Sequence, residues 1–202
     1  RDLTGASTVW TGSEILTWGG RTSSTAFASF GRRYDPVSNQ WSLISTQDQL
    51  SVRMNAMTTW TGSQWIILGG TDGLNTLSDG RRYLPEEDMW LPLAVPPLVA
   101  RYGAATFFIG GRVLVAAGQI QTQLSANDYA LYDPSTNTWS SSGFAGGCSG
   151  VSDGVANERF ALVRSETGWC AYDSQKNQWQ AVPALPDGRT LPDQNSGAIV
   201  AR

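Results

Sequence analysis

The side chains that most often carry catalysis are scarce in this chain of 202 residues. It contains no histidine, and Lys176 is its only lysine. Without histidine there is no Ser-His-Asp triad, no imidazole general base and no His-ligated metal. Lys176 lies in a predicted turn, whereas a Schiff-base lysine must be desolvated. The sequence therefore favours a protein that is not an enzyme, with no catalytic residue and no cofactor, but leaves open a catalysis based on carboxylates, Tyr, Ser or Thr, Arg or the two cysteines.

Acidic residues that could form a site occur in two places. Glu86–Asp88 could supply the two carboxyl groups that glycoside hydrolysis requires, but a predicted turn leaves them solvated. Asp72, in the segment 71–75, could bind calcium, yet the turn preferences of Asp, Gly and Asn explain this segment without an ion. We predict no metal site.

Two arginine pairs, Arg32-Arg33 and Arg81-Arg82, could form an anion site. Each pair stands between a glycine and a tyrosine within a predicted strand, away from the loops. Repetition at the same place favours a structural role. Each pair would bind a carboxylate of the next repeat or pack its stems on an aromatic ring.

Nine tryptophans are the other unusual feature of the composition. Six of them fall in positions that repeat along the chain, which predicts a packing role: Trp10, Trp41, Trp60, Trp90, Trp139 and Trp179. Trp18, Trp65 and Trp169 lie outside these positions. Any one of these three could be a platform for a ligand.

The whole sequence is organised by landmarks that recur at intervals of 44 to 50 residues. Such a period is typical of repeat architectures. The successive starts are Gly5-Ala6, Asn55-Ala56, Gly103-Ala104, Gly147-Cys148 and Gly197-Ala198. Each of the first four is followed by a tyrosine and then a tryptophan: Tyr34 and Trp41, Tyr83 and Trp90, Tyr132 and Trp139, Tyr172 and Trp179. Five starts and four endings predict four complete repeats and the opening of a fifth.

Each repeat is predicted to form four antiparallel strands, which in the second repeat cover 55–60, 64–68, 80–84 and 89–93. Glycine and proline mark the turns, and β-branched and aromatic residues fill the strands. One such sheet cannot bury both faces alone, whereas radial stacking buries them and protects the edges. The blades of this propeller are expected at about 3–46, 52–95, 100–142 and 144–183, with an extra strand at 195–202.

The landmarks also resemble the Kelch motif, in which Gly-Gly closes the second strand, Tyr-Asp-Pro closes the third and Trp opens the fourth. Trp10–Ser13 and Gly31–Pro36 are most similar to bacterial Kelch repeats of secreted or surface proteins. The resemblance covers almost the whole chain, but Arg164-Ser165 replaces the glycine pair in the fourth repeat. It implies an all-β, Kelch-type β-propeller with four complete four-stranded blades and the first strand of a fifth, either partial or four-bladed.

The resemblance also implies where a ligand would bind. In Kelch-like propellers, ligands usually meet the face formed by the loops between strands two and three and between blades. Here the former loops are 21–28, 71–78 and 119–127, which are polar and longer than the tight turns of the opposite face. The candidate ligand-binding residues are Arg21, Arg53, Asp72, Arg101 and Gln119. A role in solvating this face is the alternative for all five.

Cys148 and Cys170 fall in the predicted first and third strands of the fourth repeat. Strands two places apart are roughly 9.6 Å from each other, beyond the Cα separation of about 7 Å that a disulfide allows. A secreted protein and the glycine-rich segment 146–150 would favour a bridge. Both a disulfide and two reduced, buried thiols remain open, with a slight preference for reduced thiols.

Charge and hydropathy argue against nucleic acid as a partner and against a membrane-spanning helix. A net charge of −3 does not attract phosphate backbones, so nucleic acid is not expected as a partner. No apolar run approaches the roughly 20 residues that a membrane-spanning helix needs.

The sequence favours a non-catalytic binding module of an extracellular or cell-surface bacterial protein, which engages a protein or a glycan. The alternatives are a Kelch domain of a larger carbohydrate-active enzyme and a structural element of a surface assembly. The leftover strand, 196–201, would pair with further blades of a longer parent or with a partner chain, or would lie across a four-bladed ring.

Overall fold

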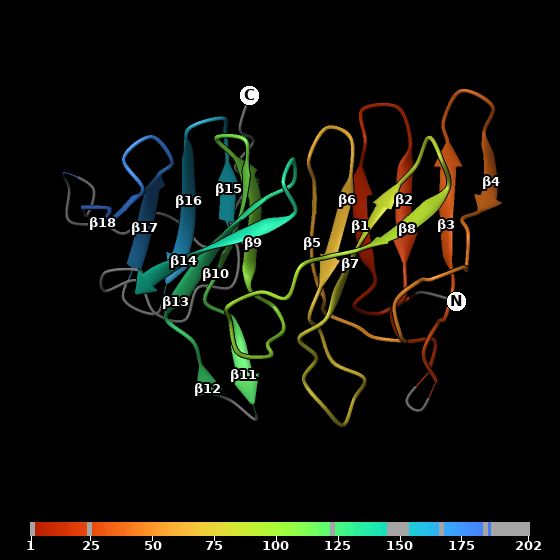
Figure 1. Ribbon diagram of the computed structural model, residues 1–202, viewed down its shortest axis with the longest axis horizontal. Helices are drawn as coiled ribbons and strands as arrows, with labels where there is room; N and C mark the ends of the chain where they lie inside the picture. The colour runs from red at the N-terminus through yellow and green to blue at the C-terminus, as the bar shows by residue number, and fades with distance from the viewer. Residues whose placement is uncertain are drawn as a thin grey trace.

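The computed structural model describes residues 3–23, 26–121, 124–144, 154–165, 168–183 and 186. These residues form strands and connecting segments, with no helix among them, and hence none that could cross a membrane. Four antiparallel sheets of four strands follow one another along the chain and stand side by side (Figure 1). The predicted extra strand at 195–202 lies outside the described residues.

The sheets are numbered in chain order. Sheet 1 contains β1 (Ser7–Trp10), β2 (Ile15–Trp18), β3 (Gly31–Asp35) and β4 (Gln40–Leu43). Sheet 2 contains β5 (Met57–Trp60), β6 (Trp65–Leu68), β7 (Gly80–Leu84) and β8 (Met89–Pro92). Sheet 3 contains β9 (Ala105–Ile109), β10 (Arg112–Ala116), β13 (Asp128–Asp133) and β14 (Thr138–Phe144), and β11 (Gln119–Gln121) and β12 (Leu124–Ser125) form a hairpin between β10 and β13. Sheet 4 contains β15 (Gly154–Ala156), β16 (Phe160–Ser165), β17 (Gly168–Asp173) and β18 (Gln178–Ala181).

The strands predicted for the second repeat agree with β5 to β8 to within two residues at each boundary. Strand β6 shows why its four residues, Trp65–Leu68, are all apolar. Trp65 and Ile67 pack toward sheet 1, whereas Ile66 and Leu68 pack toward sheet 3. Because successive side chains of a strand point to opposite faces, a strand between two neighbouring sheets is apolar at every position.

The turn between the third and fourth strands explains why Asn or Asp recurs just before the tryptophan. These residues have positive φ, a region that Asn and Asp tolerate better than most side chains. Their side-chain oxygens also accept a hydrogen bond from the tyrosine hydroxyl of the same sheet. The pairs are Tyr34 to Asn39 at 2.9 Å, Tyr83 to Asp88 at 2.6 Å, Tyr132 to Asn137 at 2.9 Å and Tyr172 to Asn177 at 2.8 Å.

Three clusters of buried side chains make up the core, one between each pair of consecutive sheets. In each cluster the tyrosine and tryptophan of the later sheet pack against aliphatic or aromatic residues of the earlier one. In the first, Tyr83 and Trp90 of sheet 2 pack with Leu16 and Trp18 of sheet 1. The first strands of consecutive sheets, β1, β5, β9 and β15, also contact one another.

Backbone hydrogen bonds connect the sheets near these first strands. The amide of Asn55 donates to the carbonyl of Gly5 at 2.8 Å, and the amide of Gly103 donates to the carbonyl of Asn55 at 3.2 Å. These three residues occupy the repeated start position, and all have φ between 53° and 69°. Only Gly and, less readily, Asn or Asp adopt this left-handed conformation at low cost. The backbone conformation therefore explains why Gly or Asn occupies the repeated start position in these three sheets.

The glycine pairs have a structural role. Gly70 follows β6, and its amide donates to the carbonyl of Arg101 at 2.9 Å. A Cβ atom at Gly70 would lie 2.8 Å from the carbonyl oxygen of Met54 and 3.0 Å from the Cα of Ala56. The end of the second strand can therefore approach the start of the first only when the side chain is absent.

Candidate ligand-binding face

The longer connections of sheets 1 to 3 lie at one end of the molecule. In an antiparallel sheet paired in chain order, the loop between strands two and three lies opposite the hairpins that join one to two and three to four. Figure 1 shows this separation, with the β6–β7 connection and the β11–β12 hairpin at the lower end and the tight turns at the upper end. The segments that connect one sheet to the next also reach this lower end, which we call the loop face.

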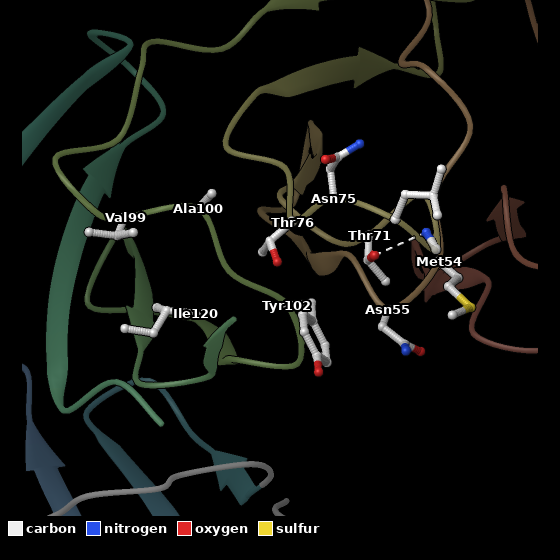
Figure 2. Close-up of a pocket in the computed structure, with 11 residues that line it drawn as sticks. Met54, Asn55, Thr71, Asn75, Thr76, Val99, Ala100, Tyr102 and Ile120 are labelled. Atoms are coloured by element: carbon white, nitrogen blue, oxygen red, sulfur yellow. Dashed lines mark hydrogen bonds between the residues drawn. The ribbon is translucent and has the colours of Figure 1, made fainter. Parts of the chain in front are cut away.

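A pocket of about 630 Å³ opens on the loop face between sheets 2 and 3. Three kinds of segment line it: the ends of the connections between sheets, the β6–β7 loop and strand β11. Figure 2 shows Val99, Ala100 and Ile120 on one side of the pocket and Thr71 and Asn75 on the other. The full lining is Met54, Asn55, Thr71, Gly73, Leu74, Asn75, Thr76, Val99, Ala100, Tyr102 and Ile120.

No charged side chain is among these lining residues. The polar groups are the amides of Asn55 and Asn75 and the hydroxyls of Thr71, Thr76 and Tyr102. Each of them can donate and accept hydrogen bonds. The remaining side chains are aliphatic or Met54. The pocket therefore suits an uncharged ligand, because a charged one would lose hydration without gaining a countercharge.

Asp72 shapes the pocket without lining it. Its Oδ1 accepts hydrogen bonds from the amides of Leu74 and Asn75 at 2.8 and 2.6 Å, and its Oδ2 accepts one from the Asn75 side chain at 3.2 Å. The bonds from Asn75 and Leu74 hold the pKa of the Asp72 carboxyl below its usual value of 3.8. The bonds that Asp72 makes within the turn therefore account for its presence in the segment 71–75.

Backbone hydrogen bonds between the connecting segments and the residues after the second strands hold the wall of the pocket in place. Tyr102 and Gln119 exchange two hydrogen bonds, of 3.0 and 2.9 Å, between their amides and carbonyls. Met54 and Thr71 exchange equivalent bonds of 2.9 and 3.0 Å, and Thr4 and Arg21 do the same in sheet 1 at 3.1 and 2.8 Å. Arg21 thus lies at the sheet 1 equivalent of the pocket wall and is not a lining residue. Gln119 is not a lining residue either, but it is next to Ile120, which lines the pocket.

Arg53 and Arg101 lie inside the protein, at 1% and 2% exposure. Arg53 donates to the carbonyls of Ser51, Gly69 and Asp79, to the hydroxyl of Ser51 and to the carboxylate of Asp79. Arg101 donates to the carbonyls of Val99 and Ala117 and to both carboxylate oxygens of Asp128, at 2.7 and 3.0 Å.

These two arginines are structural clamps, a role that the sequence reading did not assign to them. Each side chain ties together the second and third strands of its own sheet. The carbonyl of Arg53 also accepts from Gly20 of sheet 1, and that of Arg101 accepts from Gly70 of sheet 2, both at 2.9 Å. Neither guanidinium can reach a ligand without giving up these bonds. The two arginines occupy matching positions two residues before Asn55 and Gly103, and their burial shows that this repetition serves the fold.

The structure brings together residues that the sequence reading missed, above all Tyr102, Asn55 and Asn75. Of these three, the sequence carries a signal only for Tyr102: it directly follows Arg101, as Met54 follows Arg53, and both Met54 and Tyr102 line the pocket. Of the predicted residues, Asp72 and Gln119 adjoin the pocket, and Arg21 lies on the same face at sheet 1.

Trp18, Trp65 and Trp169 are buried, at 1%, 0% and 7% exposure, so none of them is a ligand platform. The indole of Trp18 donates to Gln49 at 3.1 Å and that of Trp65 to Thr58 at 2.6 Å. Trp18 and Trp65 face the core between sheets 1 and 2 because they lie in strands that pack between these sheets.

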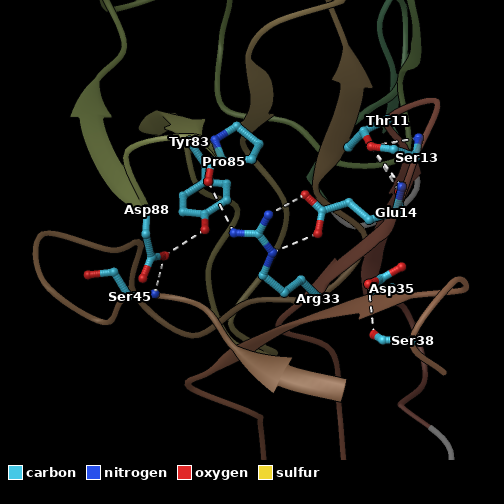
Figure 3. A network of polar contacts seen from close by, with 10 residues as sticks. All are labelled: Thr11, Ser13, Glu14, Arg33, Asp35, Ser38, Ser45, Tyr83, Pro85 and Asp88. Atoms are coloured by element: carbon cyan, nitrogen blue, oxygen red, sulfur yellow. Dashed lines mark hydrogen bonds and ion pairs between the residues drawn. The ribbon is translucent and has the colours of Figure 1, made fainter. Parts of the chain in front are cut away.

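Two roles were expected for the arginine pairs: Arg32 lies on an aromatic ring, as one of them predicts, whereas Arg33 binds a carboxylate of its own sheet and not of the next repeat. Arg33 binds both carboxylate oxygens of Glu14, in its own sheet, at 2.6 Å, and donates to the carbonyl of Pro85 in sheet 2 at 3.1 Å (Figure 3). The bond to Glu14 raises the pKa of the Arg33 guanidinium. Arg32 lies over the ring of Phe30, 5.2 Å from its centroid.

The Glu86–Asp88 turn does not form an acid pair. Asp88 accepts from the Tyr83 hydroxyl at 2.6 Å and from the amide of Ser45 at 2.7 Å (Figure 3). Glu86 and Glu87 are exposed. Burial, together with the bond to Asp88, raises the pKa of Tyr83 far above its usual value. The hydroxyl therefore stays protonated, and Asp88, which accepts from both Tyr83 and Ser45, joins sheet 2 to the connection that precedes it.

Cys170 is buried in β17 and is disulfide-bonded. The other cysteine of the chain, Cys148, lies outside the described residues. The slight preference for reduced thiols rested on Cys148 being part of the first strand of a regular sheet. Because Cys170 is disulfide-bonded, that preference is wrong.

Comparison with known proteins adds evidence on the fold. No family model and no curated protein matches the chain. Among solved structures it is similar to the one titled "Structure of YjhT", with 14% sequence identity and a TM-score of 0.70. The match covers 94% of this chain and 68% of that one. At this identity the two proteins are shown to share a fold, an all-β arrangement of small antiparallel sheets, and nothing about function follows.

Proposed function

We propose that the chain is a Kelch-type β-propeller, whole or partial, that serves as a non-catalytic binding module. The radial arrangement is supported by contacts between the first strands of consecutive sheets and by core clusters that alternate with the sheets. The repeated tyrosine, Asn or Asp, and tryptophan support the Kelch resemblance.

The ligand we propose is a neutral glycan bound in the pocket between the β6–β7 loop and β11. One observation carries this proposal: the pocket combines amides, hydroxyls and one tyrosine ring with no charged lining side chain. A sugar presents many hydroxyls and no charge, so it can satisfy these groups without leaving an unpaired ion. A few placed polar groups in a mostly apolar concavity are typical of ligand sites.

We also propose an extracellular or cell-surface location. The disulfide at Cys170 supports it, because disulfides persist mainly in oxidising compartments.

The test is a screen of the protein against neutral and acidic glycans, followed by calorimetric titration of the best neutral oligosaccharide. Tyr102→Ala should weaken binding at least about tenfold, and Tyr102→Phe roughly threefold to tenfold, the effect of one hydrogen bond. Val37→Ala is the control, since Val37 is 93% exposed in the turn between β3 and β4, at the opposite end. Unchanged affinity in Tyr102→Ala, a preference for acidic glycans, or binding only to a protein would refute the proposal.

A further inference from the structure

The pocket on the loop face has two walls of different chemistry. Val99, Ala100 and Ile120 form one wall, and all three side chains are aliphatic. Thr71 and Asn75 stand opposite them and carry a hydroxyl and an amide (Figure 2). The first wall belongs to β11 and to the connection that leads into sheet 3, whereas the second belongs to the β6–β7 loop of sheet 2. A ligand that fills the pocket therefore meets apolar groups on one side and polar groups on the other.

Hydrogen bonds hold the aliphatic wall in place. The carbonyl of Val99 accepts from Nε of the buried Arg101 at 3.0 Å. Strand β11 is tied to the same connection, because Tyr102 and Gln119 exchange two backbone bonds. The side chain of Val99 is nevertheless open to solvent, since this residue is 64% exposed. The wall therefore presents a fixed apolar surface to the pocket.

A further apolar group stands in the β6–β7 loop. Leu74 lines the pocket and is 94% exposed, although its backbone is held. Its amide donates to Oδ1 of Asp72 at 2.8 Å, and a Cβ atom at the preceding Gly73 would lie 3.1 Å from the ring of Phe27, so the loop packs against the β2–β3 connection. An exposed leucine on a fixed turn, in the same pocket as the exposed Val99, indicates a binding surface.

A sugar alone does not match the aliphatic wall. Its hydroxyls find partners in Thr71 and Asn75, and in Tyr102, which stands between Ile120 and Asn55 in Figure 2. Hydroxyls placed against aliphatic side chains would lose their hydrogen bonds to water without replacement. The pocket volume of about 630 Å³ lies within the range of about 300–1,000 Å³ that is typical of sites for drug-sized ligands. There is therefore room for a substituent beside the sugar.

We propose that the ligand of this pocket is a neutral glycan that carries an aliphatic substituent, such as the chain of an alkyl glycoside or of a glycolipid. This inference rests on the proposed glycan binding and adds the class of the group that is linked to the sugar. The sugar lies against Thr71 and Asn75, and the aliphatic chain contacts Val99 and Leu74. Binding then removes from water the apolar surface that these two residues expose, which is favourable in proportion to the area.

The test is a calorimetric titration with the methyl, butyl and octyl glycosides of the best neutral sugar. All three are used below the concentrations at which they form micelles, so that only the chain length differs. Each methylene that is buried should tighten binding roughly twofold to fourfold, so the butyl glycoside should bind at least about eightfold more tightly than the methyl glycoside. The heat capacity change of binding should also become more negative as the chain lengthens, because apolar surface is buried.

Two substitutions of similar shape remove apolar character from the pocket. Val99→Thr replaces a methyl group by a hydroxyl, and Leu74→Asn replaces two methyl groups by an amide. Each should lower the ratio of butyl to methyl affinity at least about threefold, because a polar group replaces the apolar contact. Val95→Thr and Leu124→Asn are the matched controls, since Val95 is 83% exposed, Leu124 is 62% exposed and neither lines the pocket. Both controls should keep the wild-type ratio.

Tyr102→Phe separates the contribution of the sugar from that of the chain. Loss of the hydroxyl should weaken the methyl and butyl glycosides by the same factor, so both affinities fall while their ratio stays the same. Vesicles with and without a glycolipid of the same sugar identify the source of the chain. Capture by the glycolipid vesicles alone assigns the chain to a lipid, whereas binding of the soluble glycosides without capture assigns it to a soluble compound.

Two results would overturn this inference and leave glycan binding intact. Equal affinities for the methyl and butyl glycosides would mean that the aliphatic wall does not contact the substituent. A ratio that falls as far in Val95→Thr or Leu124→Asn as in the pocket variants would mean that the chain adheres to apolar surface outside the pocket. If no glycoside of any chain length binds, the proposed glycan binding itself is refuted, and this inference with it.

Discussion

Sheets 1 and 2 carry nearly the same residues at their landmarks but stand in different surroundings. Both have Gly-Arg-Arg-Tyr in the third strand and a tryptophan in the fourth, and their ring pairs have similar geometry, with centroids 5.0 and 4.9 Å apart. Tyr83 and Trp90 are buried between sheets, whereas Trp41 is half exposed. A repeated residue thus has a stability contribution that depends on whether a neighbouring sheet covers it.

The largest difference is expected for the tryptophans of these two sheets. Trp90→Ala should lower the free energy of unfolding by roughly 3 to 5 kcal/mol, because it opens a cavity among Trp18, Trp65 and Tyr83. Trp41→Ala, at a position without such cover, should cost less than about 1 kcal/mol. Urea unfolding of both variants measures the difference. Equal losses would contradict the difference in burial between Trp41 and Trp90.

A second comparison concerns arginines. Arg101→Ala should lower the free energy of unfolding by about 3 kcal/mol, because it leaves the carbonyl of Ala117 and the carboxylate of Asp128 without their buried partner. Arg32→Ala, at an exposed position over Phe30, should cost less than about 1 kcal/mol. If Arg101 served a ligand instead, Arg101→Ala would weaken glycan binding and leave the unfolding midpoint unchanged.

The smallest expected effect is a dependence on pH that distinguishes sheet 4 from sheet 1. The bond from Arg159 lowers the pKa of the Asp173 carboxyl, and the hydroxyl of Ser38 lowers that of Asp35 in the equivalent position. A depressed pKa stabilises the fold above the unfolded value of about 3.8, and this contribution is lost as the pH falls through the folded value. Both carboxylates should therefore lose stabilisation in acid.

Unfolding midpoints from pH 6 to pH 3, a range that brackets the usual aspartate pKa, test this comparison. Asp173→Asn should flatten the pH dependence more than Asp35→Asn, because only Asp173 has a cationic partner. An equal flattening would mean that the ion pair adds nothing to the hydrogen bonds of the turn, as is common for exposed pairs.

The sequence alone determined the strands, the division into repeats and the conformation of the turns. Alternating and continuous apolar runs, left-handed positions filled by Gly or Asn, and the tyrosine that bonds to Asn or Asp are all local, so they can be read from neighbouring residues. Tertiary structure decided which tryptophans are covered, that Arg53 and Arg101 clamp the sheets from within, and that Tyr102 and Asn75 share a pocket. These outcomes depend on which sheet stands next to which, and identical landmarks at Trp41 and Trp90 therefore have different surroundings.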